Sequence, residues 1–279
     1  KIAVLKRVTQ LTIEILVPLI IILVFGLPHG AADGILAYRI MSSKPIKFLF
    51  FLFSYITAGL MVILIWIFFP LTSLTVFLFI SCIHFGILDS NTLGIDSFQF
   101  LRVMVHGSTI VLVIPVAHPT EVKILFDLLV GNDTAIIFTI INITLYIWIT
   151  GATILILLTK SQRLRIFFEI SIIVGLAIVL PPLWGFAVYF CIIHSFRHFK
   201  NIWLIFREQY TANEAIILIS GISLISVSLV ISVAWFTAYD NLTNSLIRST
   251  FIGLAAFTVP HVLFIDAFGV INQLNKRTN

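Results

Sequence analysis

The run from Cys191 to Lys200 sets two histidines, His194 and His198, four residues apart in an otherwise apolar stretch, with Arg197 between them. Residues four apart lie about one helical turn from each other on the same face, so both imidazole rings can reach one point. Ionisable side chains are costly to bury, and inside a membrane segment they are by default candidates for a functional site. The pair therefore predicts a site whose remaining groups must come from elsewhere in the chain.

Three further polar clusters interrupt apolar runs, and in each an aspartate follows a histidine by four or five residues. The pairs in sequence are His29 and Asp33, His84 and Asp89, and His261 and Asp266. This spacing lets each aspartate approach a histidine of its own helix or of a neighbouring one. A carboxylate that accepts a hydrogen bond from one ring nitrogen fixes the tautomer and leaves the other nitrogen for a metal ion. We therefore expect Asp33 and Asp89 to orient metal-binding histidines. Arg197 is expected to pair with one of these carboxylates or to extend toward lipid headgroups.

The composition indicates an integral membrane protein. Of the 279 residues, 60% are hydrophobic and 10% are charged, with a mean hydropathy of +1.14. Soluble domains carry about 25% charged residues. The net charge of +5 is not gathered into a basic face, so no nucleic-acid partner is expected. We predict one all-α, polytopic transmembrane helix bundle over residues 1–279, with no separate soluble module.

The apolar runs predict about seven to nine spans, since several exceed the roughly 20 residues that cross a bilayer and a kink at Pro28 could join two of them. The runs cover residues 8–28, 46–69, 71–89, 98–118, 134–159, 165–182, 183–206, 213–238 and 246–270. The segment 121–130 is too short to span and is expected at the membrane interface. With the N-terminus outside, most lysines and arginines fall on the cytoplasmic side. We expect a multi-pass protein of the plasma membrane.

The alternating direction of the spans places most histidines in one layer, near the cytoplasmic leaflet. The layer holds His29, His84, His106, His194, His198 and His261. His118, at the far end of its run, falls on the opposite side. Any one of these residues alone could be a satisfied core histidine, and His106, His261 and Asp266 are expected in a substrate pocket or in hydrogen bonds rather than as direct ligands.

The chemistry of such a layer leaves more than one function open. Neutral imidazole suits Zn, Cu, Fe and Ni, and four imidazoles on an octahedral Fe(II) would leave two positions for oxygen chemistry. A proton or metal-ion transporter with an intramembrane His/Asp layer is the alternative, although the repeats typical of transporters are absent from the sequence. A haem protein with His194 or His198 as axial ligand is a third interpretation. No His-Glu-x-x-His motif of a zinc protease occurs.

The ordered set of motifs resembles the Brp/Blh-like β-carotene 15,15′-dioxygenases, which are membrane carotenoid-cleaving enzymes associated with microbial rhodopsins. The resemblance rests on Pro28-His29-Gly30 with Asp33, His84-Phe85-Gly86 with Asp89, Arg102 with His106-Gly107, His194-Ser195-Phe196-Arg197-His198, and Pro260-His261. Each motif alone is weak. Together they span nearly the whole chain in the order that the family has.

The resemblance implies an activity, a metal and its ligands. It implies that Fe(II) is held by His29, His84, His194 and His198. It further implies cleavage of the central 15,15′ double bond of β-carotene with O2 to give two all-trans-retinal, which could pass to a microbial rhodopsin. The 26 phenylalanines would suit an apolar channel for this polyene among the membrane lipids. A dioxygenase route and a monooxygenase route both remain open.

Overall fold

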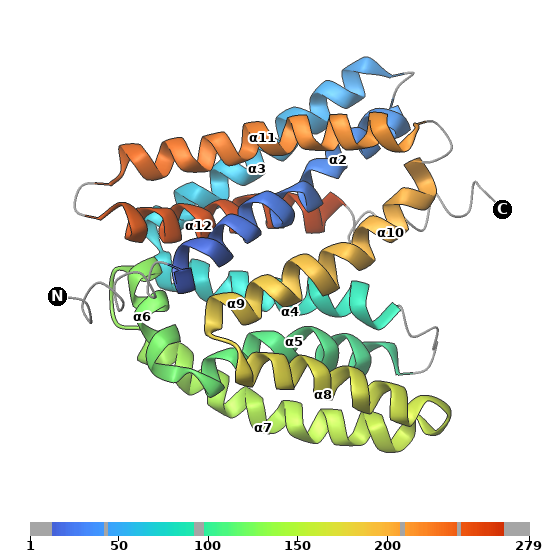
Figure 1. The fold of residues 1–279 in the computed structure, drawn as a ribbon, viewed down its shortest axis with the longest axis vertical. Helices are drawn as coiled ribbons and strands as arrows, with labels where there is room; N and C mark the ends of the chain where they lie inside the picture. The colour runs from blue at the N-terminus through green and yellow to red at the C-terminus, as the bar shows by residue number, and fades with distance from the viewer. Residues whose placement is uncertain (1–12, 42–43, 92–97, 207–209, 239–240, 265–279) are drawn as a thin grey trace. The chain divides into compact units, whose positions relative to one another are not determined.

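The computed structural model describes residues 13–41, 44–91, 98–206, 210–238 and 241–264, and all regular structure in them is helical (Figure 1). The α-helices are α2 (Leu27–Met41), α3 (Pro45–Phe68), α4 (Pro70–Asn91), α5 (Gln99–Ala117), α6 (Pro119–Val130), α7 (Ala135–Leu158), α8 (Arg163–Val179), α9 (Pro182–Ala187), α10 (Ser195–Phe206), α11 (Ala212–Phe236) and α12 (Leu242–Val262). Two π-helical segments, η1 (Ile22–Gly26) and η3 (Val188–His194), and a 3₁₀ turn, η2 (Lys160–Gln162), connect some of them.

Six of the described helices are long and apolar enough to cross a membrane, namely α3, α4, α5, α7, α11 and α12. A shorter apolar helix covers Ile13–Gly26. Large apolar side chains on these helices are exposed, for example Phe50 and Ile67 on α3, as expected of surfaces that face lipid. The prediction of an all-α, multi-pass membrane protein is confirmed, and the number of spanning helices is roughly that expected. The segment predicted to be too short to span forms the 12-residue helix α6.

The first helical run continues past the point where the sequence predicts its end. The run was expected to stop at residue 28, yet the helix goes on through Pro28 to Met41. A proline inside a helix has no N–H to donate to the carbonyl four residues before it. That carbonyl belongs to Val24, which lies in η1, where the backbone has already widened to π-helical hydrogen bonding. The widened turn lets the chain continue, and so brings Asp33 into a helix.

The chain divides into two compact units. The first takes Lys1–Leu19 and Leu74–His194, and the second takes Ile20–Ser73 and Ser195–Asn279. In the first unit, α5 packs against α7, α8, α6 and α9. Val105, Leu155 and Ile166 are buried in this packing. In the second unit, α12 packs against α3 and α11, and α11 also packs against α2 (Figure 1).

Two glycines let the backbones of α4 and α5 touch. A Cβ atom at Gly86 would overlap the backbone of Val103, and one at Gly107 would overlap the carbonyl of Cys82. Small residues are the usual means by which membrane helices approach closely. His84 lies between Cys82 and Gly86, so the crossing fixes the depth and direction of this histidine. The same crossing positions the buried His106, which precedes Gly107.

Replacing Gly107 by alanine should destabilise the protein, because the new methyl group would meet backbone that cannot move without displacing α4. Overpacked sites cost about 1–3 kcal/mol, and each kcal/mol lowers the Tm by about 2–4 °C in chains of this size. Thermal unfolding of the purified protein in detergent measures the effect. Gly175→Ala on α8 is the matched control, since a Cβ there meets open space, and its Tm should stay or rise slightly. Equal melting of both variants and wild type would contradict the close crossing.

Candidate metal centre

A buried histidine pair lies in the first unit. His84 comes from α4 and His194 ends η3, and their Nε2 atoms are 3.2 Å apart. The ring centroids are 4.9 Å apart and the ring planes are inclined by 71°. Two imidazole nitrogens on neighbouring positions of one metal ion, each about 2.1 Å from it, would be separated by about 3.0–3.4 Å. Both side chains are buried, so the pair has the spacing of two ligands shielded from water.

A carboxylate and a phenol lie behind this pair. Nδ1 of His194 is 3.6 Å from Oδ1 of Asp89, and the hydroxyl of Tyr189 donates a hydrogen bond of 2.7 Å to Oδ2 of Asp89. Nδ1 of His194 thus faces a carboxylate while Nε2 faces His84. Metal-binding histidines usually donate a hydrogen bond to such a carboxylate, which fixes the tautomer and the direction of the ring; here the two atoms face each other at a distance longer than a hydrogen bond. His194 lies on another element than Asp89, about a hundred residues later in the chain.

Aromatic rings surround His194 within the first unit. The centroid of Phe85 lies 4.6 Å from that of His194, and the ring of Phe190 stacks at 6.1 Å with an interplanar angle of 17°. Phe190 stacks in turn on Phe186. These rings leave the imidazole little freedom to rotate and replace water around it by apolar surface.

A second cluster lies in the second unit. Oδ2 of Asp33 on α2 is 2.7 Å from Nδ1 of His261 on α12, and it accepts a hydrogen bond of 2.8 Å from the hydroxyl of Tyr55 on α3. The ring of His198 on α10 lies beside His261, with centroids 5.1 Å apart and planes inclined by 70°. Asp33, His198 and His261 are buried, and their potential ligand atoms all lie within 4.8 Å of one another. Among the described residues, this is the group of three that could hold a metal ion.

For the other predicted site residues, the structure gives only their burial or a single contact, or does not describe them. The side chain of His29 and the whole of Asp266 lie outside the described residues. His106 is buried on α5, and Arg197 is partly buried on α10. His118 lies at the junction of α5 and α6, where its Nε2 donates to the carbonyl of Ala177 at 3.1 Å, and it belongs to neither histidine pair.

The two tyrosines that donate hydrogen bonds to the aspartates are not among the residues predicted from the sequence. A signal exists, because the chain uses 26 phenylalanines but only 6 tyrosines. A tyrosine in the middle of an apolar span where phenylalanine is the common choice needs a hydrogen-bond partner for its hydroxyl. Tyr55 and Tyr189 both occupy such positions, and in each case the partner is a buried aspartate.

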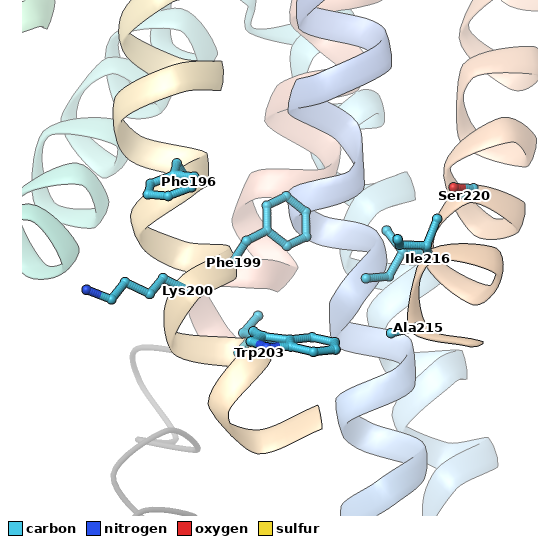
Figure 2. A pocket seen from close by; sticks show the side chains of 9 residues that line it. Phe196, Phe199, Lys200, Trp203, Ala215, Ile216 and Ser220 are labelled. Carbon is cyan, nitrogen blue, oxygen red and sulfur yellow. The ribbon is translucent and has the colours of Figure 1, made fainter. Parts of the chain in front are cut away.

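An apolar groove runs beside the second cluster, between α10 and α11. Its volume is about 570 Å³, and it is lined by Phe196, Phe199, Lys200, Ile202, Trp203, Ala215, Ile216, Ile219 and Ser220. Figure 2 shows Phe199 and Trp203 reaching from α10 toward Ile216 and Ala215 of α11, while the amino group of Lys200 extends away from α11. The helix that buries His198 thus presents an apolar groove on another face.

Comparison with known proteins identifies the family of this chain. A sequence model described as β-carotene 15,15′-dioxygenase matches residues 20–269. A β-carotene 15,15′-dioxygenase from uncultured marine bacterium 66A03 is 32% identical over 254 residues, which are 89% of this chain and 91% of the relative. No solved structure matches the chain. Because the matched region includes every histidine motif, the chain belongs to the β-carotene 15,15′-dioxygenase family.

Proposed function

We propose that this chain is a membrane-bound, Fe(II)-dependent oxygenase that cleaves the central 15,15′ double bond of β-carotene with O2 to give two all-trans-retinal. The reaction and the substrate are those that the relative and the family are named for. The observation that carries the metal-dependent part is the buried pair of His84 and His194 with its Nε2 atoms 3.2 Å apart.

The iron would be held by the histidines predicted from the sequence. These are His29, His84, His194 and His198. The donor chemistry fits, because neutral imidazole is a ligand that iron accepts and His84 and His194 have ligand spacing. Bound there, iron would supply the activation of O2 that organic side chains cannot provide.

The side chains around the metal would bind, orient and exclude water. In the overall reaction one carbon–carbon double bond breaks and two carbonyl groups form, and the oxygen atoms of one O2 enter the products. No proton and no external electron is consumed, so no side chain has to act as acid or base. Asp89 and Tyr189 would keep the ring of His194 in one orientation. The aromatic rings around His194 would keep water from the reacting atoms.

The groove along α10 would take up part of the hydrocarbon chain of the substrate. Its lining is apolar apart from Lys200 and Ser220, and its size falls within the roughly 300–1,000 Å³ of small-molecule sites. It lies on the helix that carries His198, on another face from this proposed ligand. We place the protein in the plasma membrane with the iron nearer the cytoplasmic leaflet. The retinal formed there could pass to a microbial rhodopsin.

His198→Ala should abolish both iron binding and cleavage, because it removes one proposed ligand. In cells that accumulate β-carotene, the wild-type chain should bleach the colour and yield retinal, whereas this variant should leave the colour. Metal analysis of the purified variant should find at least a tenfold loss of iron per chain. The control is His118→Ala, which removes a histidine outside both pairs and should keep iron and activity.

Two results would contradict this proposal in different ways. Persisting colour with folded, iron-loaded wild-type protein would contradict the reaction, and cleavage by His198→Ala would contradict its role as a ligand. Metal-free wild-type protein that carries protons or metal ions across liposome membranes would instead favour the transporter.

Ser220→Phe should raise the KM for β-carotene several-fold, because the larger ring would narrow the groove at its α11 wall. The iron content and kcat should change little, since the substitution is outside the metal ligands. Steady-state kinetics in detergent micelles measures both constants. Ile225→Phe, on an exposed position of α11 outside the groove, is the matched control. Equal KM values for the two variants would mean that the substrate does not use the groove.

A further inference from the structure

The two units contain the same arrangement of a tyrosine, an aspartate and a histidine pair. In the first unit, Tyr189 donates to Asp89, which faces Nδ1 of His194. In the second unit, Tyr55 donates to Asp33, which faces Nδ1 of His261. The Nδ1 side of His261 therefore faces the same kinds of groups as that of a histidine proposed to bind iron, at a shorter distance: 2.7 Å to Asp33 against 3.6 Å to Asp89.

Each of these two rings also has a neighbouring imidazole at a similar distance and inclination. His194 lies beside His84 with centroids 4.9 Å apart and planes inclined by 71°, and His261 lies beside His198 with centroids 5.1 Å apart and planes inclined by 70°. We propose that His261 is a further iron ligand, binding through Nε2, with Asp33 and Tyr55 as the residues that position it. This inference rests on the proposed iron-dependent function.

The hydrogen bond to Asp33 decides which nitrogen of His261 is available. The 2.7 Å between Nδ1 and Oδ2 is the length of a charge-assisted hydrogen bond. With the proton on Nδ1, the lone pair of the ring is on Nε2, on the opposite edge. Asp33 already accepts from both Tyr55 and His261 through one oxygen, so it acts as an orienting group for His261.

A purely structural role for His261 would explain less of the geometry. Anchoring Asp33 requires only Nδ1 and a donor, and any orientation of His198 would serve. A ligand role for His261 is supported by the burial of both rings, by the edge-to-face approach of His198 and by the potential ligand atoms of Asp33, His198 and His261 lying within 4.8 Å of one another. The sequence predicts a pocket or hydrogen-bonding role for His261. The hydrogen bond to Asp33 is present, and the ligand role through Nε2 comes in addition to it.

His261→Asn separates the two roles. The asparagine amide can still donate to Asp33 from near the position of Nδ1 but has no atom at the position of Nε2. We expect purified, Fe(II)-reconstituted His261→Asn to hold at least tenfold less iron per chain than wild type, with the cobalt-substituted protein losing its ligand-field absorption, while thermal unfolding in detergent stays close to wild type. The control His118→Asn should keep both iron and spectrum.

Asp33→Asn tests the positioning role without touching a ligand. Loss of such an orienting carboxylate costs about 10–100-fold in metal affinity, and we expect a decrease of that size with a shifted cobalt spectrum. If His261→Asn does not fold, this variant decides the question. Wild-type iron affinity and an unchanged cobalt spectrum in the folded variants would overturn the inference alone. Wild-type protein that binds no iron would instead overturn the proposed function.

Discussion

A carboxylate buried among apolar helices needs hydrogen-bond donors from other elements, and one aspartate in each unit imposes this constraint. Asp33 on α2 draws donors from α3 and α12, through Tyr55 and His261. Asp89 on α4 lies opposite Tyr189 and His194 of η3. A buried acceptor left without its donors costs about 1–3 kcal/mol, and more if charged. The same contacts therefore hold the helices together and aim the imidazole rings.

Two features of the backbone allow these polar groups to meet. Gly86 and Gly107 let α4 and α5 approach until their backbones touch, which sets the position of His84. The π-helical segments insert extra backbone into a helix and so turn the following residues to another face. One such segment ends at His194 and another precedes His29 along the chain. Both interruptions of regular helix therefore lie next to histidines that the proposed function requires.

The sequence predicts the helices and the polar residues well, because both follow from local information. Apolar runs of spanning length predict α3, α4, α5, α7 and α11 within two residues at each end, and the start of α12 within four. The cost of a buried charge marks His84, His194, Asp33 and Asp89. The partners of the aspartates are not local. Asp89 faces His194, about a hundred residues away in the chain, because the rotation and register of packed helices decide which side chains meet. The spacing of residues within one helix carries no information on the rotation or the register of that helix against its neighbours.

The partner of His261 is also far away in the sequence, which explains why the sequence predicts a pocket or hydrogen-bonding role for this histidine rather than a ligand role. The sequence leaves open whether a carboxylate reaches His261 from its own helix or from another one, and the structure places Asp33, more than two hundred residues earlier, at its Nδ1. The sequence likewise leaves open whether Pro28 ends a helix or only kinks it, and η1 lets the helix continue through this proline. In both cases a contact or a backbone adjustment in the folded chain decides between alternatives that local rules cannot separate.

The aspartates also suit the metal that the proposed function requires. An Fe(II) ion held only by neutral imidazoles would carry two positive charges into surroundings of low dielectric, where an uncompensated charge is costly. A carboxylate behind a ligand histidine would offset part of that charge without itself binding the metal. Asp89 faces His194 in this way in one unit, and Asp33 faces His261 in the other. Each of these buried carboxylates accepts a hydrogen bond from a tyrosine, because a buried carboxylate without a donor is costly.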